Sequence, residues 1–195
     1  MQNSRLLEGA LTRLTAINPE SDAQAFTNWQ RDTEYWRLLD SDPPHLPGIK
    51  QTQEWMEKTE SENRDFAIRT RADDKLIGFC GMHLRHGPHR DTFIYIGIGE
   101  RDYRGKGYGT DAHGVLLHYA FTELDLHRVS LSVFGYNERA IRSYEKLGYV
   151  REGVQRQELL RNGRRWDSIM MGLLASEWRT QSSESSVPHP DSYPL

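Results

Sequence analysis

The sequence has little of several features that define large classes of protein. Its 195 residues include one cysteine, Cys80, which excludes an internal disulfide and a cysteine-based metal site. Cys80 lies in the apolar run Leu76–Met82, where a small buried hydrophobe is expected rather than a reactive thiol. No run approaches the ~18 apolar residues that span a bilayer, and no apolar signal segment opens the chain. A cytoplasmic protein without a membrane segment is therefore expected.

Positive charge is not in excess either. Lys and Arg number 25 against 28 Asp and Glu, which gives a formal net charge of −3. Because both signs are scattered along the chain, stable binding of nucleic acid is not expected. His83, His86 and His89 are spaced by three, but no carboxylate or thiol pattern completes a metal site. They are interpreted as part of a polar loop, and no metal is expected.

The length fits one domain with a substantial core. We expect this domain to cover residues 1–179. From Thr180 the sequence TQSSESSVPHPDSYPL is polar and contains proline, which predicts a disordered tail over residues 180–195.

Hydrophobic patterns predict strands and helices in a mixed order. The predicted strands are Leu6–Ile17, Arg64–Arg71, Lys75–Arg85, about 92–99, Val129–Phe134, Tyr149–Leu160 and Arg164–Leu174. The predicted helices are about Pro19–Gln30, Asp32–Asp40, Gln51–Glu60, Ala112–Ala120 and Asn137–Leu147. Turn residues at Ala72–Asp74 and Asn162-Gly163 predict two hairpins, and Gly148 is expected to cap a helix in the left-handed conformation.

The most informative stretch is Asp91–Phe121. Its apolar run Phe93–Ile98 predicts a buried strand, in which Gly97 indicates a bulge or a close approach to the backbone. The glycine-rich loop Arg104–Thr110 carries two cations and leads into an amphipathic helix. Because a helix N-terminus offers unpaired N–H groups and a partial positive charge, this order suits a pyrophosphate.

Spacing excludes two common phosphate-binding loops. The chain has no Gly-x-x-x-x-Gly-Lys-Ser/Thr run, and Gly105, Gly107 and Gly109 do not fit Gly-x-Gly-x-x-Gly. Arg104-x-x-Gly107-x-Gly109 instead resembles the Arg/Gln-x-x-Gly-x-Gly/Ala motif of the GNAT superfamily of N-acetyltransferases. The segment Asn137–Tyr149 resembles that family's Asn-x-x-Ala-x-x-x-Tyr-x-x-x-Gly-Phe motif. The resemblance covers about Leu6–Trp178 and is closest to the RimJ/RimL-type branch, which includes spermidine N-acetyltransferases.

This resemblance implies an α/β fold with a mixed sheet of six or seven strands and helices on both faces. A splayed pair of strands, about 92–99 and 129–134, would admit the pantetheine arm of acetyl-CoA, the implied cosubstrate. Backbone N–H groups of the glycine loop and the Arg104 side chain would bind the pyrophosphate. The implied cofactor-binding residues are Ile96, Ile98, Arg104, Gly105, Lys106, Gly107, Tyr108, Gly109, Thr110, Asn137 and Tyr144.

The catalytic roles follow from the same resemblance. Tyr144 matches the family tyrosine that protonates the departing thiolate, and the N–H of Ile98 would donate to the thioester oxygen. Many relatives carry a glutamate two residues before the glycine equivalent to Gly97, and here that position is Tyr95. Glu100 and Asp91 are the candidate substitutes for this base.

The acceptor is less defined. Phe26, Trp29, Tyr35 and Trp36 lie in the sequence beside four acids, Asp32, Glu34, Asp40 and Asp42. They are interpreted as core aromatics in preference to a direct cation–π site for an amine. A protein N-terminus is mildly favoured over a polyamine, because an α-amino group has a pKa of only ~7.7–8.0. The sequence leaves three alternatives open. The acceptor could be an aminoglycoside-type molecule, the protein could be a non-catalytic acyl-CoA-binding module, and it could form a homodimer.

Overall fold

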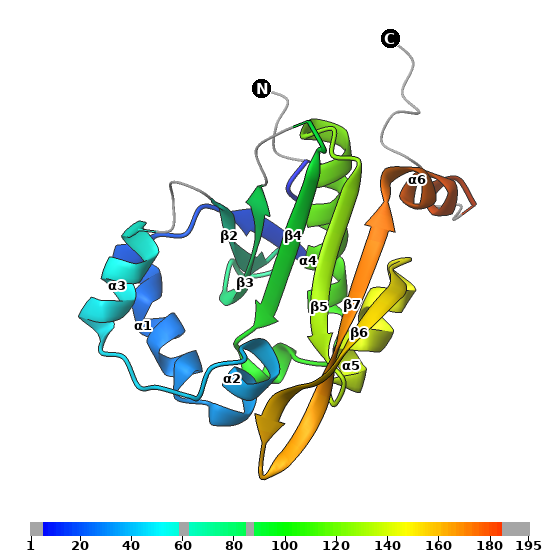
Figure 1. The fold of residues 1–195 in the computed structure, drawn as a ribbon. Coiled ribbons are helices and arrows are strands. Elements are labelled where there is room, and N and C mark those ends of the chain that lie inside the picture. The colour runs from blue at the N-terminus through cyan, green and yellow to red at the C-terminus, as the bar shows by residue number, and fades with distance from the viewer. Residues whose placement is uncertain (1–5, 59–62, 85–87, 185–195) are drawn as a thin grey trace.

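The computed structural model describes residues 6–58, 63–84 and 88–184, and these contain a seven-stranded sheet with the order β1-β2-β3-β4-β5-β7-β6 (Figure 1). The strands are β1 (Thr12–Thr15), β2 (Asn63–Thr70), β3 (Leu76–Leu84), β4 (Asp91–Ile98), β5 (Arg128–Phe134), β6 (Val150–Arg161) and β7 (Arg164–Leu174). Neighbours are antiparallel except β4 and β5, which are parallel. The prediction of a mixed sheet of six or seven strands is confirmed.

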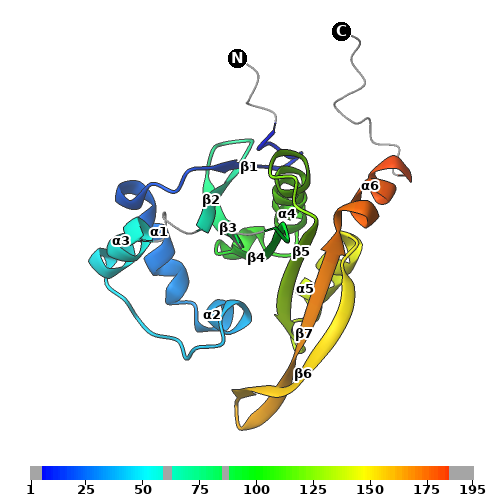
Figure 2. The same ribbon diagram turned by 45° about the horizontal axis from the view of Figure 1, so that its top comes forward.

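Helices cover both faces of this sheet, as predicted. They are α1 (Pro19–Gln30), α2 (Thr33–Leu39), α3 (Ile49–Lys58), α4 (Tyr108–His118), α5 (Glu138–Lys146) and α6 (Ala175–Glu184). Figure 2 shows α1, α2 and α3 grouped apart from α4 and α5. A 3₁₀ turn, Arg101–Tyr103, precedes the glycine loop, and a π-helical turn, Tyr119–Glu123, continues α4.

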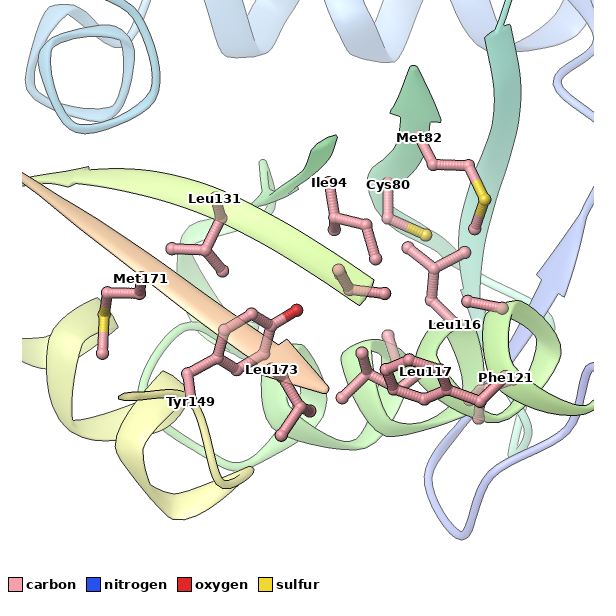
Figure 3. Packing of buried hydrophobic residues seen from close by; sticks show 14 of the residues in the cluster. Cys80, Met82, Ile94, Leu116, Leu117, Phe121, Leu131, Tyr149, Met171 and Leu173 are labelled. Atoms are coloured by element: carbon pink, nitrogen blue, oxygen red, sulfur yellow. The ribbon is translucent and has the colours of Figure 1, made fainter. Parts of the chain in front are cut away.

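Two hydrophobic clusters hold the helices against the sheet. In the larger one, strand residues such as Cys80 and Ile94 pack against Leu116 of α4 (Figure 3). Cys80 is fully buried, and burial raises the pKa of its thiol, so the interpretation of Cys80 as a small core residue is confirmed. The smaller cluster joins α1, α2 and α3 to Phe79 of β3, and Phe26 lies at its centre.

Strands β4 and β5 separate soon after they begin. Their pairing runs only from Asp91 opposite Arg128 to Phe93 opposite Ser130. Strand β5 stays paired with β7 along its whole length, from Arg128 to Phe134. Beyond Phe93, therefore, one side of β4 has no neighbouring strand to pair with. The predicted splayed pair is confirmed.

The bulge predicted at Gly97 is wrong, whereas the alternative of a close approach is correct. Strands β3 and β4 pair without a register shift from Gly78 opposite Ile98 towards the start of β4. A Cβ on Gly97 would collide with the hydroxyl of Tyr35, and a Cβ on Gly99 would collide with the ring of Trp29. The two glycines are needed because aromatic side chains of α1 and α2 lie against the strand.

The turns follow the sequence closely. Gly148 ends α5 with a φ of 93°, and the hairpin of β6 and β7 turns at Asn162 and Gly163, with φ of 52° and 72°. Both glycines and the asparagine adopt the left-handed conformation that their positions predict.

Two predicted boundaries differ from the structure, and a third falls outside the described residues. The first strand covers only Thr12–Thr15, because Glu8–Leu11 turns back instead of extending. Helix α6 continues to Glu184, past Thr180 where the tail was predicted to begin, and residues 185–195 lie outside the described residues. Helix α3 is described to Lys58, and the predicted end at Glu60 also lies outside them.

Membrane insertion was not expected from the sequence. Among the residues that the structure describes, no helix is both long and apolar enough to cross a bilayer.

One carboxylate fixes the turn before β1. Asp111, in the first turn of α4, accepts hydrogen bonds from the N–H groups of Ala10, Leu11 and Thr12 at 2.9–3.1 Å. It also accepts one from the Thr12 hydroxyl at 2.6 Å. Strand β1 is thereby attached to the N-terminus of α4.

We predict that Asp111→Ala lowers the free energy of unfolding by about 1.5–3 kcal/mol, because hydrogen bonds to a charged acceptor are lost. Urea denaturation followed by circular dichroism measures the change. The control is Glu54→Ala, which removes an exposed carboxylate of α3 and should change stability by less than about 0.5 kcal/mol. Equal effects of the two substitutions would contradict the role of Asp111.

Candidate active site

The glycine loop between β4 and α4 has the geometry of an anion site. Gly105 and Gly107 have φ of 74° and 91°, which residues with a Cβ adopt only under strain. Gly107 is the residue before α4, and its carbonyl accepts the N–H of Asp111. The preceding N–H groups, of Tyr108, Gly109 and Thr110, have no acceptor within the helix and add to its partial positive charge.

A groove of about 350 Å³ lies beside this loop and reaches the open side of β4. We call it the loop groove. The predicted cofactor residues that line it are Ile96, Ile98, Arg104, Gly105, Gly107, Gly109, Thr110, Asn137 and Tyr144. Lys106 and Tyr108 are not among its lining residues. Lys106 is exposed, and the ring of Tyr108 packs edge-on against Tyr103 at 5.0 Å.

Three cations of the loop groove were missed by the sequence analysis. Arg139, Arg142 and Lys146 of α5 all line it. They recur at i, i+3 and i+7, so they share one face of the helix, and this spacing was the available signal. They give the groove the positive charge that Lys106 was predicted to supply.

The guanidinium of Arg104 has partners within the protein. It donates to the carbonyl of Ile98 at 2.9 Å and to Asp32 at 2.8 Å, and also donates to the Gly99 carbonyl. It stacks over the ring of Tyr35, 4.6 Å from the centroid. These contacts join the end of β4 to α2, and binding of the pyrophosphate by this side chain stays a prediction.

The backbone of β4 presents one N–H to the groove. The carbonyl of Gly97 lies against Gly78 of β3, so close that a Cβ on Gly78 would collide with it. In a trans peptide the following N–H points the opposite way. The N–H of Ile98 therefore faces the open side of β4, as its predicted role requires.

Tyr144 is placed by two helices. It lines the loop groove from α5, with its ring 5.4 Å from that of His113 on α4. The hydroxyls of Thr110 and Ser143 lie 2.7 Å apart and connect these helices. Burial raises the pKa of Tyr144 to about 12, so the phenol keeps its proton at neutral pH.

His113 is a second residue that the sequence analysis missed. It is buried in α4, with Nε2 2.9 Å from the Tyr149 hydroxyl, and burial lowers its pKa to about 3. The imidazole is therefore neutral. A polar residue on the apolar face of a predicted helix was the only signal for it.

Asn137 links α5 to α2. Its side-chain oxygen accepts the N–H of Ala140 at 3.3 Å and so caps the N-terminus of α5. Its side-chain nitrogen donates to the carbonyl of Leu38 at 3.4 Å. Contact with the arm of a cofactor stays a prediction for this residue.

Neither Glu100 nor Asp91, the two candidate bases, lies beside Gly97, where the amine would lose its proton. Glu100 accepts a hydrogen bond from Trp29 at 2.9 Å and pairs with Lys75 at 3.2 Å. Burial opposes its ionisation, but these two partners outweigh burial and hold its pKa below the usual range. It lines neither the loop groove nor the pocket described next. Asp91 begins β4, six residues from Gly97, or roughly 20 Å along an extended strand.

A second and larger cavity, of about 680 Å³, lies between the helices α1–α3 and the sheet. We call it the aromatic pocket. Helices supply Phe26, Trp29, Tyr35, Trp36 and Trp55 to its lining, and strands supply Phe79, Phe93 and Tyr95. The sequence interpretation of the helical aromatics as core residues is therefore incomplete, because they pack together and also enclose a cavity.

Of the four acids considered as amine ligands, only Asp40 and Asp42 line the aromatic pocket. Asp32 is paired with Arg104 at 2.8 Å, and Glu34 is paired with Arg101 at 3.2 Å.

The two cavities meet at α2. Tyr35 and Leu39 line both, and both side chains lie against Gly97. The Tyr35 hydroxyl is buried without a hydrogen-bond partner, and burial raises its pKa. Tyr35 and Leu39 therefore form a wall that the two cavities share beside Gly97.

The described residues contain no group of three or more side chains suited to hold a metal ion. His83 hydrogen-bonds to Asn63 at 2.6 Å, His89 is exposed, and His86 lies outside the described residues.

A family model described as the acetyltransferase (GNAT) domain matches residues 12–150. The match spans most of the chain, so the protein belongs to the GNAT acetyltransferase family and is an N-acetyltransferase. The resemblance predicted from the two sequence motifs is thereby confirmed.

Several relatives support this assignment. The chain is 29% identical over 166 residues to the SPbeta prophage-derived uncharacterized N-acetyltransferase YokL of Bacillus subtilis, covering 85% of this chain and 90% of that protein. It is 32% identical over 123 residues to the spermidine N(1)-acetyltransferase of Vibrio cholerae, covering 63% and 70%. The structure of a Vibrio cholerae spermidine N-acetyltransferase in complex with CoA and spermine has a TM-score of 0.77 and 26% identity, covering 86% and 98%.

The contacts of Arg104 lead to a prediction. Burial opposes ionisation of Asp32, but hydrogen bonds from Arg104 and the N–H of Tyr35 outweigh it and lower its pKa. Arg104→Met should therefore cost about 1.5–3 kcal/mol at pH 7. Because a carboxyl with a lowered pKa stabilises the fold only above its ordinary pKa, near 3.9, this cost should shrink as the pH falls below about 4.

Denaturation of both proteins between pH 3 and pH 7 measures this difference. The matched control is Arg101→Met, because Arg101 and Glu34 are both largely exposed and such pairs contribute only about 0–1 kcal/mol. A pH-independent cost for Arg104→Met would contradict the assigned partnership with Asp32.

Proposed function

We propose that this protein transfers the acetyl group of acetyl-CoA to a primary amine, with acetyl-CoA in the loop groove and the amine in the aromatic pocket. The observation that carries the proposal is that the two cavities share Tyr35 and Leu39, which lie against Gly97 on β4, one residue before Ile98. Two substrates that enter from opposite sides would come together at this shared wall.

The loop groove suits the charge and shape of CoA. The N–H groups from Gly105 to Thr110 would bind the pyrophosphate, and the α5 cations Arg139, Arg142 and Lys146 would add charge. The amides of pantetheine would pair with β4 around Ile96 to Ile98, where β5 has moved away. The Vibrio cholerae enzyme of similar fold is in complex with CoA, which supports CoA as the ligand class.

The transfer itself needs few groups. The amine nitrogen attacks the thioester carbon, and the N–H of Ile98 donates to the oxygen as negative charge develops there. As the carbon–sulfur bond breaks, Tyr144 gives its proton to the thiolate, and the amine loses a proton to a base. Desolvation beside His113 keeps Tyr144 in the protonated form that this step uses.

The relatives are named for different acceptors. Two of them are spermidine acetyltransferases, from Vibrio cholerae and Escherichia coli, and another is a putative ribosomal N-acetyltransferase of Bacillus subtilis. A protein N-terminus and a small amine both stay within the proposed function.

We predict that Tyr144→Phe lowers kcat by about 100-fold or more, the usual scale for loss of a positioned acid, while acetyl-CoA affinity changes less than twofold. Release of CoA thiol measures turnover, and calorimetric titration measures affinity. Tyr119→Phe, which removes a hydroxyl from the π-helical turn, is the matched control and should behave as the wild type.

Unchanged turnover in Tyr144→Phe would remove Tyr144 from this step. A wild-type protein that binds acetyl-CoA and acetylates no amine would favour instead a non-catalytic acyl-CoA-binding module.

A further inference from the structure

The aromatic pocket carries information about the acceptor. Its volume of about 680 Å³ lies within the range of ~300–1,000 Å³ that is usual for small-molecule sites. Neighbouring rings form a continuous wall, with Phe26 4.8 Å from Trp29 and 5.2 Å from Phe79, and Trp36 edge-on to His45 at 5.3 Å. Rings packed at these separations present faces and edges to the cavity, and another aromatic group can pack against them.

Charge in the pocket is sparse. Among its described lining residues the only carboxylates are Asp40 and Asp42, and Asp42 is exposed in the loop after α2. Each ammonium group that leaves water costs several kcal/mol unless it is paired, and a cation–π contact returns only about 0.5–2 kcal/mol. The ammonium that reacts beside Gly97 loses its charge in the reaction, so its desolvation is not a lasting cost. The desolvation cost of any further ammonium group in the pocket would not be offset by a paired carboxylate.

We propose, on the basis of the proposed function, that the acceptor is a primary amine with a single aromatic or large apolar group, which the aromatic pocket encloses. The amine would lie at Tyr35 and Leu39, which the pocket shares with the loop groove, and the ring would lie towards Trp36 and Phe26. The same chemistry is present in a free arylalkylamine and in a peptide that begins with Phe, Tyr or Trp. A polycation such as spermidine does not match it.

The test is an acceptor panel at fixed acetyl-CoA, with CoA thiol release as the readout. It compares phenethylamine and tryptamine with propylamine and spermidine, and Phe-initiated and Trp-initiated peptides with their Ala-initiated and Ser-initiated counterparts. We expect kcat/KM to be about 10- to 100-fold higher for each aromatic member, from the burial of one ring. A preference for the peptides over the free amines would identify a protein N-terminus as the source.

A second arm uses Trp36→Leu, which should remove most of the aromatic preference without changing the KM for acetyl-CoA. Trp166→Leu, at a tryptophan of β7 outside the pocket, is the control. Highest activity with spermidine, or equal activity of aromatic and small acceptors, would overturn the inference while the transferase function stands. Absence of transfer to every amine would instead overturn the proposed function.

A second, independent observation concerns the group that removes a proton from the acceptor amine. Asp65 of β2, Gly81 of β3 and Tyr95 of β4 are consecutive partners across three strands. Since Gly81 has no side chain, Tyr95 reaches across it and donates its hydroxyl to Asp65. A Cβ on Gly81 would collide with both side chains.

One member of the pair, Tyr95, borders the proposed acceptor cavity. Tyr95 lines the aromatic pocket and precedes Gly97 by two residues, so both face the same side of β4. The charged or titratable neighbours of the pair are His83, whose ring is 4.8 Å from that of Tyr95, and the buried thiol of Cys80. Burial raises the pKa of Asp65, and this effect outweighs the hydrogen bond from Tyr95 and the charge of His83, which lower it. The carboxylate is therefore a stronger base than an exposed aspartate.

The geometry points to a proton relay in which the acceptor ammonium transfers its proton to Asp65 through the hydroxyl of Tyr95. The phenolic oxygen takes the proton from nitrogen as its own proton moves to the carboxylate. One N–H and one O–H bond break, two O–H bonds form, and the products are a neutral amine, neutral Tyr95 and protonated Asp65. Tyr95 is then a catalytic residue, and Asp65 acts through it.

We expect Tyr95→Phe and Asp65→Asn each to lower kcat/KM at least tenfold at pH 7, and the double variant to lose no more than either alone, because the residues act in series. The decisive readout is the pH profile. Without the relay the acceptor must arrive already deprotonated, so kcat/KM of the variants should rise tenfold per pH unit and approach that of the wild type above the pKa of the acceptor.

Asp102→Asn, an exposed acid of the 3₁₀ turn, is the matched control and should leave the profile unchanged. A loss that persists at high pH would show a merely structural role for the pair and overturn the relay. Wild-type rates in the two single variants would overturn it as well, while activity of the wild type itself would still support the transferase function.

Discussion

The fold depends on the parting of β4 from β5 after Phe93. A strand that leaves its neighbour exposes backbone N–H and C=O groups that must find other partners. Strand β5 solves this by pairing with β7 over its whole length, and β4 is left with an unpaired side next to the glycine loop. This unpaired side borders the loop groove, the proposed cofactor site. An extended chain with amide groups, such as a pantetheine arm, would complete the sheet there, with the N–H of Ile98 at its end.

Much of this architecture was accessible from sequence because it rests on local rules. Alternation and apolar runs predicted the strands, and Asn162-Gly163 predicted the last hairpin because few other residues accept left-handed φ at both positions. Glycines predicted the loop before α4, but the helix begins at Tyr108 and not near Ala112, where its apolar spacing begins. The first strand was predicted too long, because the pattern of residues 6–11 does not show that Asp111, about a hundred residues later, holds them in a turn.

The side-chain partners in the site were less accessible. Arg104 has the right position in the motif, but its guanidinium binds Asp32 of α2, a partner that only the packing of α2 reveals. Glu100 has the right chemistry and is already held by Lys75 and Trp29. The contact of Tyr95 with Asp65 depends on the register of three strands at once, and no pattern within one strand encodes it.

Arg104 also belongs to both halves of the site. Its guanidinium fastens the end of β4, which borders the loop groove, to Asp32 and Tyr35, which begin the helix that separates the two cavities. A substitution of this one side chain therefore affects the borders of both cavities. Any coupling of binding free energies that passes through it has the same size in both directions.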